Sequence, residues 1–490
     1  MAYKDSREFL DKLRKHGMLK TINIQVDWDE EVAAICQELM VTQGSAVHFN
    51  NIKDYQNTWC KDLVLDATMS NIERLKVAMD VPLATTNTEL VLKWRDAVKE
   101  SIKPYLLSSG PCKEEIIKGN DIDLYQIPAP KYHRKDGGRY INTWSSIITK
   151  DPETGVINVG NYRGMICDKD KIAVLIIPTQ GWGLHFQKYS AMNKPMPVAI
   201  VNGADPILHL CGVTPFPHYM CEYDVAGGVR GEPLELTMGE TIDLPIPAAA
   251  EIVIEGEIDP RVRVKEGPFG EYNGYFVSLR SNPQPVINVK CITHRRDPIY
   301  QGVMNGVVSA RYGSPHDSLK VCHCAAMWDH MERAGVRGIT GVWGIGSPLA
   351  MVVVRIKQEF YGHARQAANA LWSMPISVMA GKWVIVVDDD VDIYDPDKVL
   401  IAISNMVRAG EDLEIFHNTG GGVLDPSVHP DILERTGHIG SWDRVFVDAT
   451  RPFDWKPREE WGGEKFPYHA LAEEDMLEKV RKRWTKYGLE

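Results

Sequence analysis

The chain has 490 residues, of which 44% are hydrophobic and 25% charged, and its formal net charge is −11. This length and composition are typical of a globular protein with about two to four domains. The acidic balance argues against a nucleic-acid-binding protein, which would present a basic surface. No run of about 20 apolar residues is present, so no membrane span is expected. The polar N-terminus lacks a signal-peptide pattern and predicts a cytoplasmic protein.

Nine cysteines are scattered along the chain without a CxxC pair. Cys322 and Cys324 are separated only by His323, which is closer than the usual spacing of zinc ligands. We therefore expect buried or helical thiols rather than a zinc site. The same pattern fits a reducing compartment.

Residues 1–115 predict a small N-terminal α/β domain. The segment 5–17 has Phe9, Leu10 and Leu13 on one helical face, with Gly17 as its expected C-cap. A second helix is expected to begin with Asp29 as its N-cap. Alternating segments predict strands at 19–26, 45–52 and 62–67.

Residues 116–315 have a different pattern, with short predicted strands separated by glycine and proline. This pattern predicts a barrel or a sandwich. Helices are expected only near 185–191 and 222–228. The predicted strands are 145–150, 171–178, 197–203, 250–258 and 285–295.

Residues 316–490 predict a third, α/β domain that begins with a helix ending at Gly335. Strand and helix patterns then alternate, over 349–358, 362–374 and 382–407. The tail 473–488 is an amphipathic helix, which we expect to pack on a neighbouring domain or subunit.

Three consecutive acids, Asp388 to Asp390, follow a hydrophobic strand. Acids at the C-terminal end of a strand can hold magnesium. No phosphate-binding glycine loop precedes them, and the glycines of 341–348 match no nucleotide-binding pattern. A solvated turn is therefore the favoured interpretation.

Two further segments carry candidate ligand-binding residues. Asn158 and Arg163 lie five residues apart around Gly160, at a strand edge where the backbone can approach a ligand closely. Such a pair is usually structural. Glu222 has two possible roles, as a metal ligand or as the cap of a short helix.

The segment "EGPFGEYNGY" places Glu266 and Glu271 around a Gly-Pro-Phe-Gly turn. Residues five apart in a regular strand point to opposite faces, but this turn breaks the alternation and can aim both acids at one cavity. Two nearby carboxylates raise each other's pKa, and an arginine lowers it. Such a cluster can keep one acid ionised and leave the other able to carry a proton near neutral pH. The sequence does not by itself place Arg163 there.

Seven segments, in order, resemble the UbiD-type reversible decarboxylase family over residues 100–450. They are "NVGNYR", "NGADP", "CEYDVAGGVRGEP", "LPIPAAAEIVIEGEI", "EGPFGEYNGYF", "FYGHARQAANALW" and "VIVVDDDVD". The resemblance implies a mixed α/β protein with an N-terminal α/β domain, a central split β-barrel that binds the cofactor, and a C-terminal oligomerisation domain joined by a helix. These correspond to residues 1–115, 116–315 and 316–490.

The resemblance also implies a chemistry. Such enzymes decarboxylate aromatic or heteroaromatic acids reversibly and without net oxidation, through a covalent adduct with prenylated FMN, and use a divalent metal, usually Mn²⁺, and K⁺. The expected partners are a small aromatic acid, CO₂, a flavin prenyltransferase that supplies the cofactor, and further copies in a homodimer or homohexamer. Neither nucleic acid nor membrane is expected. The alternatives are a cofactor-binding subunit of a multi-component aryl carboxylase, an aryl-CoA decarboxylase, or a scaffold without activity.

Matching the family motifs residue by residue assigns roles. Arg163, Glu266 and Glu271 match the family's Glu-Arg-Glu network, with Glu271 at the proton-donor position. Asn158 and Glu222 match metal ligands. The residues expected to contact the cofactor are Asn161, Tyr162, Arg163, Gln180 and Arg444.

One position departs from the family pattern. Family members commonly have Gln-His where this chain has Gln180 followed by Gly181, and that His binds the metal. His185 can replace it only if the loop is rearranged. Water or a phosphate oxygen of the cofactor can also fill the position.

Overall fold

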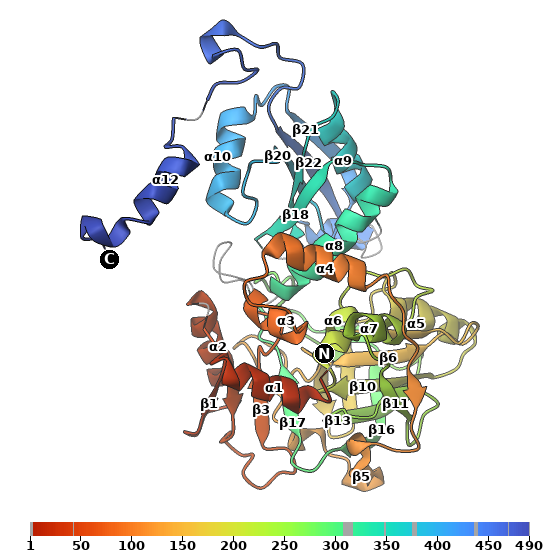
Figure 1. Cartoon of the computed structure of the whole chain (residues 1–490). Coiled ribbons are helices and arrows are strands. Elements are labelled where there is room, and N and C mark those ends of the chain that lie inside the picture. The colour runs from red at the N-terminus through yellow and green to blue at the C-terminus, as the bar shows by residue number, and fades with distance from the viewer. Residues whose placement is uncertain are drawn as a thin grey trace.

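The described residues of the computed structural model form three main sheets and two small ones, with helices packed around them (Figure 1). The described residues are 3–42, 44–306, 317–346, 349–374, 380–435, 440–468 and 470–489. The N-terminal and central sheets lie next to each other, and α4 (Asn87–Ala97) and α8 (Asp317–Arg333) lie between them and the C-terminal sheet. The predicted boundary at 315/316 falls outside the described residues.

The N-terminal sheet has four strands in the order β1-β2-β3-β17. Its local elements are α1 (Ser6–Lys15), β1 (Leu19–Ile22), α2 (Glu31–Val41), β2 (Ala46–Phe49), β3 (Asp62–Leu65) and α3 (Ile72–Ala78). The fourth strand, β17 (Ile299–Gly302), pairs parallel with β3. The chain therefore returns to this sheet at the end of the segment that the sequence assigns to the central domain.

The first two helices show one success and one failure of the sequence prediction. α1 buries Phe9, Leu10 and Leu13 as predicted, and Gly17 follows its C-cap with φ of +70°. The predicted N-cap of α2 is wrong, because the N-cap is Glu30 and not Asp29. Asp29 instead forms a backbone bridge with Lys131, which holds it in extended chain before the helix begins.

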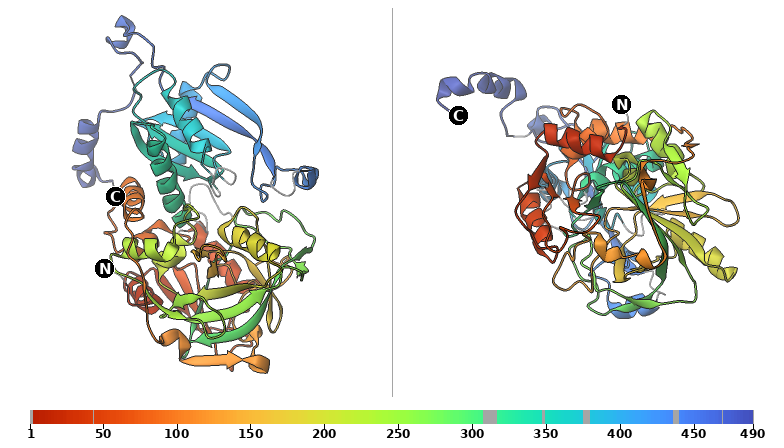
Figure 2. Two further views of the ribbon diagram at one scale, coloured as in Figure 1. Left: turned by 90° about the vertical axis from the view of Figure 1, so that its right-hand side faces the viewer. Right: turned by 90° about the horizontal axis from the view of Figure 1, so that it is seen from below.

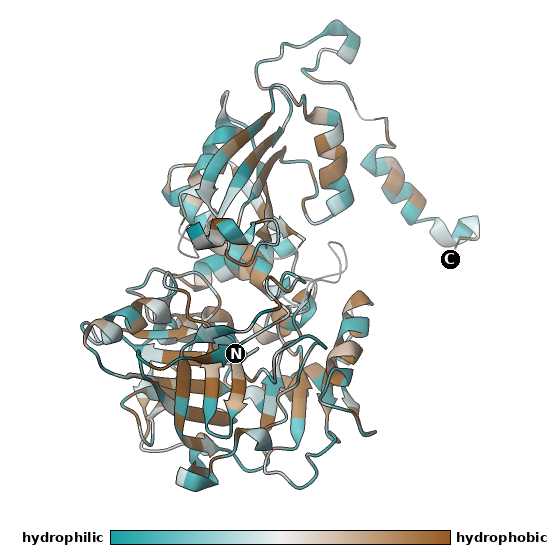
Figure 3. Cartoon of the chain, turned by 180° about the vertical axis from the view of Figure 1, so that it is seen from behind, coloured by the Kyte–Doolittle hydropathy of each residue, from teal (hydrophilic) through white to brown (hydrophobic). Residues whose placement is uncertain are grey.

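The central sheet has eight strands and is curled. Seven of them follow the order β7-β6-β10-β13-β16-β9-β8, and β5 pairs with β16. The strands are β5 (Glu115–Lys118), β6 (Ser146–Lys150), β7 (Ile157–Gly160), β8 (Gly164–Asp168), β9 (Lys171–Val174), β10 (Met196–Asn202), β13 (Ile252–Ile258) and β16 (Val286–His294). β10, β13 and β16 are mostly buried, in keeping with their hydrophobic side chains (Figure 3).

The two edge strands β7 and β8 are consecutive in the chain and joined only by residues 161–163. A flat sheet of seven strands would separate its edges by about 29 Å. Four Cα–Cα steps from Gly160 to Gly164 span at most about 15 Å. The sheet must therefore curl until its edges approach, and residues 161–163 bridge the split.

Helices and small sheets complete the central part. The helices are α5 (Gly181–Ala191), α6 (Pro206–Cys211) and α7 (Glu222–Arg230), and the short strands are β4 (Tyr105–Leu106), β11 (Glu235–Met238), β12 (Pro245–Pro247), β14 (Val264–Glu266) and β15 (Asn282–Gln284). α5 and α7 overlap the predicted helices. α6 was not predicted, although Asp205 caps it and Pro206 starts it.

The C-terminal sheet has five strands in the order β18-β19-β20-β22-β21. β19, β20 and β22 are parallel, and β18 and β21 are antiparallel edges. The elements are β18 (Ile339–Ile345), β19 (Met351–Ile356), α9 (His363–Trp372), β20 (Trp383–Asp388), α10 (Pro396–Met406), β21 (Leu413–Gly420), α11 (Pro430–Arg435), β22 (Ser441–Ala449) and α12 (Glu474–Arg481). The predicted helix before Gly335 is confirmed as α8.

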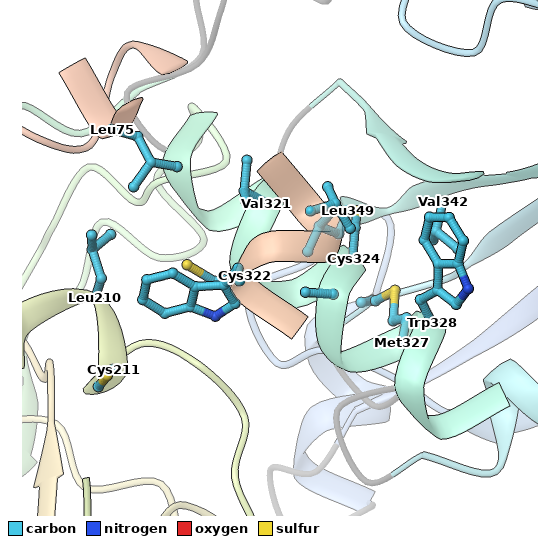
Figure 4. Packing of buried hydrophobic residues seen from close by; sticks show 14 of the residues in the cluster. Leu75, Leu210, Cys211, Val321, Cys322, Cys324, Met327, Trp328, Val342 and Leu349 are labelled. Carbon is cyan, nitrogen blue, oxygen red and sulfur yellow. The ribbon is translucent and has the colours of Figure 1, made fainter. Parts of the chain in front are cut away.

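α8 connects the central and C-terminal parts through buried side chains on both of its sides (Figures 2 and 4). Cys322 and Leu210 belong to the same buried cluster as Trp328 and Val342. Cys322 and Cys324 are buried on this helix, as predicted for helical thiols. The helix therefore forms a wall shared by the two parts.

Two of the three acids at the end of β20, Asp388 and Asp390, take structural roles. Arg451 contacts Asp388 at 3.4 Å and Asp390 at 2.5 Å, and Gln358 donates to Asp388 at 3.1 Å. These contacts fix the end of the strand, in line with the favoured interpretation of a turn.

The tail helix α12 lies apart from the rest of the chain (Figures 1 and 2). None of its described side chains is buried. The predicted packing on a neighbouring domain is therefore not found within this chain, and packing on another subunit stays a prediction. Across the described ranges, no helix is long and apolar enough to cross a membrane.

Candidate active site

The bridge between β7 and β8 carries Arg163, whose guanidinium contacts both predicted acids. Nη2 donates to Glu266 Oε2 at 2.8 Å, and Nη1 donates to Glu271 Oε1. Glu266 is 2% exposed and Glu271 5% exposed. The two acids and the arginine of the sequence analysis therefore form one buried cluster.

The turn between the acids explains how they meet. β14 ends at Glu266, and Gly267 follows with φ of +86°, a conformation that favours glycine. The Gly267–Pro268 peptide is cis. The chain reverses over these residues, so Glu266 and Glu271 approach Arg163 from the same side instead of pointing to opposite faces.

Glu266 accepts from a second donor besides Arg163. The hydroxyl of Tyr140 donates to Glu266 Oε1 at 2.8 Å, and its ring lies 4.0 Å from the ring of Phe269. Arg163 lies over that phenyl ring at 5.4 Å. Glu266 is therefore held by hydrogen bonds from two side chains.

Glu271 is poised to hold a proton. Burial raises the pKa of Glu271 to about 6, although Arg163 lowers it, and the nearby charge of Glu266 adds to the rise. Burial opposes the charge of Arg163, but Glu271 and Glu266 raise the pKa of Arg163 above its ordinary value. The arginine therefore stays charged while Glu271 titrates near neutral pH.

A cavity of about 210 Å³ opens beside this cluster. Its polar wall includes Asn142, Asn161, Tyr162, Arg163, Gln180 and Glu271. Its apolar wall includes Met69, Val213, Leu319, Ala380 and Leu424. The side-chain amide of Asn273 donates to Leu424 O, which ties the loop that follows Glu271 to the C-terminal part. The cavity thus lies where the central part, α8 and the C-terminal part meet.

The predicted metal ligands Asn158 and Glu222 lie at the same end of the sheet. Glu222 Oε2 accepts from the Val159 amide at 2.9 Å, and the Asn158 side-chain amide contacts the Tyr162 hydroxyl at 3.3 Å. The Tyr162 ring stacks on Trp182 at 4.3 Å. Amide and carboxylate oxygens are hard donors that suit a divalent cation such as Mn²⁺.

Gly181 packs against one of these donors. A Cβ atom at position 181 would lie 1.8 Å from Asn158 Oδ1. No side chain fits there while Asn158 keeps its conformation. The absence of the family histidine at 181 is therefore built into the packing of α5 on β7.

His185 lies one turn further along α5 and has its own partner. Its Nδ1 is 2.9 Å from Thr149 Oγ1, and the side chain is buried. Burial lowers the pKa of His185 to about 4, so the imidazole is neutral. Within the described ranges, no three His, Cys, Asp or Glu side chains gather as metal ligands. The structure gives His185 a hydrogen-bonding role and does not bring it into a three-ligand cluster.

Three family models match the chain in order. They are the N-terminal, Rift-related and C-terminal domains of 3-octaprenyl-4-hydroxybenzoate carboxy-lyase, over residues 10–94, 105–308 and 318–449. Protein sll0936 of Synechocystis sp. is 30% identical over 99% of this chain and 96% of its own length. The chain belongs to the UbiD family.

Solved UbiD-class structures are similar to this one over nearly their whole length. HmfF from Pelotomaculum thermopropionicum, solved with FMN, is 30% identical, covers 97% of this chain and 99% of its own, and has a TM-score of 0.82. An evolved dimeric form of HmfF, solved with prFMN, is 28% identical over 97% and 98% of the two chains, with a TM-score of 0.79. Vanillic acid decarboxylase from Sedimentibacter hydroxybenzoicus, in closed form, is 27% identical over 99% and 100%, with a TM-score of 0.85. The predicted mixed α/β fold of the UbiD family is confirmed.

The side-chain amide of Asn142 shows whether the polar groups of the cavity wall suit the flavin of UbiD enzymes. It is 1% exposed, and neither atom of its side-chain amide has a partner among the described residues. An unpaired buried donor and acceptor are rare and costly in a native structure. A flavin carries an N–H flanked by two carbonyl groups, which can pair with both amide atoms. The cavity wall therefore fits a flavin.

Arg444 is the remaining residue that the UbiD motifs predict to contact the cofactor. It lies on β22, where its Nη2 donates to Gly420 O at 3.3 Å and its guanidinium lies 5.7 Å from the Trp372 ring. It is not among the residues that line the cavity. Contact between Arg444 and the cofactor stays a prediction.

The sequence analysis of this UbiD protein did not single out Asp136, Tyr140 or Asn142. All three lie in the stretch "DGGRYIN", more than 100 residues before Glu266 and Glu271. An Asp-Gly-Gly step indicates a turn. It does not indicate what the turn packs against, because that is set by long-range packing.

Gly181→Ala is expected to destabilise the protein by about 1–3 kcal/mol, because the added Cβ displaces Asn158 from its position. Gly410→Ala is the matched control, since nothing lies within 4 Å of a Cβ at that exposed position. The midpoint of urea unfolding measures both. Equal midpoints for Gly181→Ala and Gly410→Ala would show that Asn158 is not held by Gly181.

Glu222→Gln is expected to stabilise the metal-free protein at pH 8 by about 2 kcal/mol. Burial raises the pKa of Glu222 to about 7, and the Val159 amide only partly offsets this rise. A raised pKa means that the wild type loses stability as pH rises through 7, whereas glutamine keeps the Val159 contact without charge.

The stabilisation by Glu222→Gln should shrink below about 1 kcal/mol at pH 5, where folded Glu222 is protonated. Urea unfolding in chelator at both pH values measures the effect. Added Mn²⁺ should reverse the order, because only the carboxylate binds the ion strongly. Equal stability of the two proteins at pH 8 would contradict the account.

Proposed function

We propose that this protein reversibly decarboxylates an aromatic or heteroaromatic carboxylic acid without net oxidation, with prenylated FMN in the cavity and Glu271 as the proton donor. The observation that carries the proposal is the buried pairing of Arg163 with both Glu266 and Glu271 at the wall of that cavity. Relatives solved with FMN and prFMN, and one that is a vanillic acid decarboxylase, support the reaction class.

Loss of CO₂ from an unsaturated carbon leaves an electron pair that no amino-acid side chain can accept. The prenylated flavin, when bound, supplies this electron sink. The chain supplies binding, orientation and protons. Asn142 and Gln180, together with the backbone of Asn161 and Tyr162, are the residues that would hold the flavin against the split in the sheet.

Arg163 has the central orienting role. Its guanidinium donates to Glu266, which also accepts from the Tyr140 hydroxyl, and its charge can attract a substrate carboxylate to the same wall. The apolar wall around Met69, Leu319 and Leu424 suits an aromatic ring and limits access of water.

Glu271 moves the proton. Its pKa of about 6 allows it to exchange a proton close to neutral pH, its side chain contacts Arg163, and it lines the cavity. After CO₂ leaves, protonated Glu271 can protonate the carbon that carried the carboxylate. In the reverse direction the ionised carboxylate removes that proton.

We propose that Asn158 and Glu222 are the chain's share of a divalent metal site, with phosphate oxygens of the cofactor and water as further ligands in place of a histidine. Mn²⁺, K⁺, a flavin prenyltransferase as cofactor supplier, a homodimer or homohexamer and a cytoplasmic location follow from the family resemblance. They are proposals on that ground alone.

The test is co-expression with a flavin prenyltransferase, followed by absorbance and mass spectrometry of the bound cofactor. The loaded protein is then assayed for CO₂ release and for exchange of ¹³C-labelled bicarbonate into a panel of benzoates, polycyclic acids, furoates and aryl-CoA thioesters. We expect turnover of at least one class. Protein that carries prenylated FMN and exchanges no carboxylate across the panel would refute the proposed function.

A further inference from the structure

A third buried carboxylate, that of Asp136, lies directly behind the turn that joins Glu266 to Glu271. The side chain of Asp136 has no exposed surface. Its Oδ1 accepts from the Gly270 amide at 2.9 Å, and its Oδ2 accepts from the His133 backbone amide at 2.9 Å. Gly270 is the residue before Glu271, so Asp136 fixes the backbone from which the proposed proton donor extends.

Residues next to Asp136 hold the same turn at a second point. The Gly137 amide donates to Pro268 O at 2.8 Å, and the Tyr140 hydroxyl is 3.1 Å from the same oxygen. The segment 136–140 therefore forms hydrogen bonds with both ends of the Pro268–Gly270 turn. Hydrogen bonds on both sides leave the turn little freedom to carry Glu271 away from Arg163.

His133 extends this contact to another wall of the cavity. Its Nδ1 lies 3.3 Å from Asp136 Oδ2, and its Nε2 lies 2.9 Å from the carbonyl oxygen of Asn305. Asn305 lines the cavity. Asp136 is thus connected to the proton donor on one side and to the cavity wall on the other.

We propose that Asp136 is a positioning residue for proton transfer, which holds the Gly270 amide so that Glu271 stays on Arg163 and at the cavity. The inference rests on the proposed function, because it assigns Asp136 a part in delivering the proton of Glu271. Asp136 is not among the residues that line the cavity.

The charge of Asp136 adds an electrostatic effect to this positioning. The charged groups that face Glu271 are Arg163, Glu266 and Asp136, with the phenols of Tyr140 and Tyr272 nearby. The negative charge of Asp136 favours the protonated form of Glu271, so Glu271 can donate a proton up to a higher pH. A carboxylate that only stabilised the fold would have no such effect on catalysis.

The test compares Asp136→Asn with wild type as holoenzymes loaded with prenylated FMN. Asparagine has one acceptor oxygen for two donors, the Gly270 and His133 amides, so it weakens the hold on Gly270, and it removes the charge. We expect kcat to fall about tenfold. The pH above which kcat/KM declines should be about 0.5–1 pH unit lower than in the wild type, and the affinity for FMN should be unchanged.

Asp123→Asn is the matched control. Asp123 also accepts a backbone amide in a turn, from Tyr125 at 3.0 Å, and it is not among the cavity-lining residues. Its pH profile should equal that of the wild type. A wild-type profile in Asp136→Asn, even with reduced kcat, would overturn the proposal, because it would reduce Asp136 to a structural role.

Amide hydrogen exchange of the flavin-free protein tests the positioning without activity. The Gly270 amide should exchange at least tenfold faster in Asp136→Asn than in wild type, and Asp123→Asn should leave it unchanged; equal exchange would overturn the proposal. If Asp136→Asn does not fold, Asp136→Ser replaces it, with the same expected shifts. If the wild-type holoenzyme shows no activity, that result counts against the proposed function alone. The hydrogen-exchange result would still decide the role of Asp136.

Discussion

The Glu271→Gln holoenzyme is expected to release CO₂ about 10²–10⁴ times more slowly than wild type, while it still binds the flavin. Glutamine can accept the hydrogen bond of Arg163 as glutamate does, but it has no proton to give to carbon. Steady-state kcat for CO₂ release measures the loss, and the flavin spectrum of the purified protein confirms that the site is filled.

The control for this loss is Glu232→Gln, at an exposed position after α7. Its kcat should match that of the wild type. The wild-type kcat/KM should fall as pH rises above about 6, the pKa of Glu271, because donation requires the protonated acid. Glu271→Gln should lose this dependence. A variant that keeps more than a tenth of wild-type kcat would remove Glu271 as the donor.

Arg163→Met is expected to lower the free energy of unfolding by about 3–5 kcal/mol at pH 8, since it leaves two buried carboxylates without their shared cation. Without the arginine, Glu271 loses the cation that lowers its pKa, so its folded-state pKa rises further above the unfolded value. The destabilisation should therefore shrink at pH 5, where folded Glu271 is protonated. Urea unfolding at the two pH values measures this.

Two further variants separate charge from packing. Combining Arg163→Met with Glu266→Gln and Glu271→Gln should recover most of the lost stability at pH 8, because no buried charge remains. Arg337→Met breaks an exposed ion pair with Glu359 and should cost less than about 1 kcal/mol. If the triple variant is as unstable as Arg163→Met, the arginine acts through packing and the electrostatic account fails.

Local patterns predicted much of the fold correctly. The apolar face of α1, the helical pattern of α8 and the short apolar runs of the central strands lie within single segments, so local patterns identify them. β17 was not predicted, and its partner β3 lies more than 200 residues away. The curl of the central sheet follows from its strand order, which no local pattern records.

The features of the candidate site also divide into those that local patterns predicted and those that only tertiary packing creates. The Gly-Pro-Phe-Gly turn indicated that Glu266 and Glu271 can face one cavity, and the family motifs supplied Arg163. The contact of Gly181 with Asn158 Oδ1 depends on how α5 packs on β7. The contact of Asp136 with Gly270 joins residues 134 positions apart. Contacts of this kind arise from tertiary packing and leave no spacing that can be read from the sequence.

Decarboxylation in D₂O tests the central claim most directly. Wild-type protein loaded with prenylated FMN is given the aryl carboxylate that it turns over best, and the product is examined by NMR for deuterium at the carbon that carried the carboxylate. We predict one deuterium at that carbon for each CO₂ released, with no release from protein that holds unmodified FMN. Product without deuterium at that carbon, or equal CO₂ release with unmodified FMN, would contradict the account.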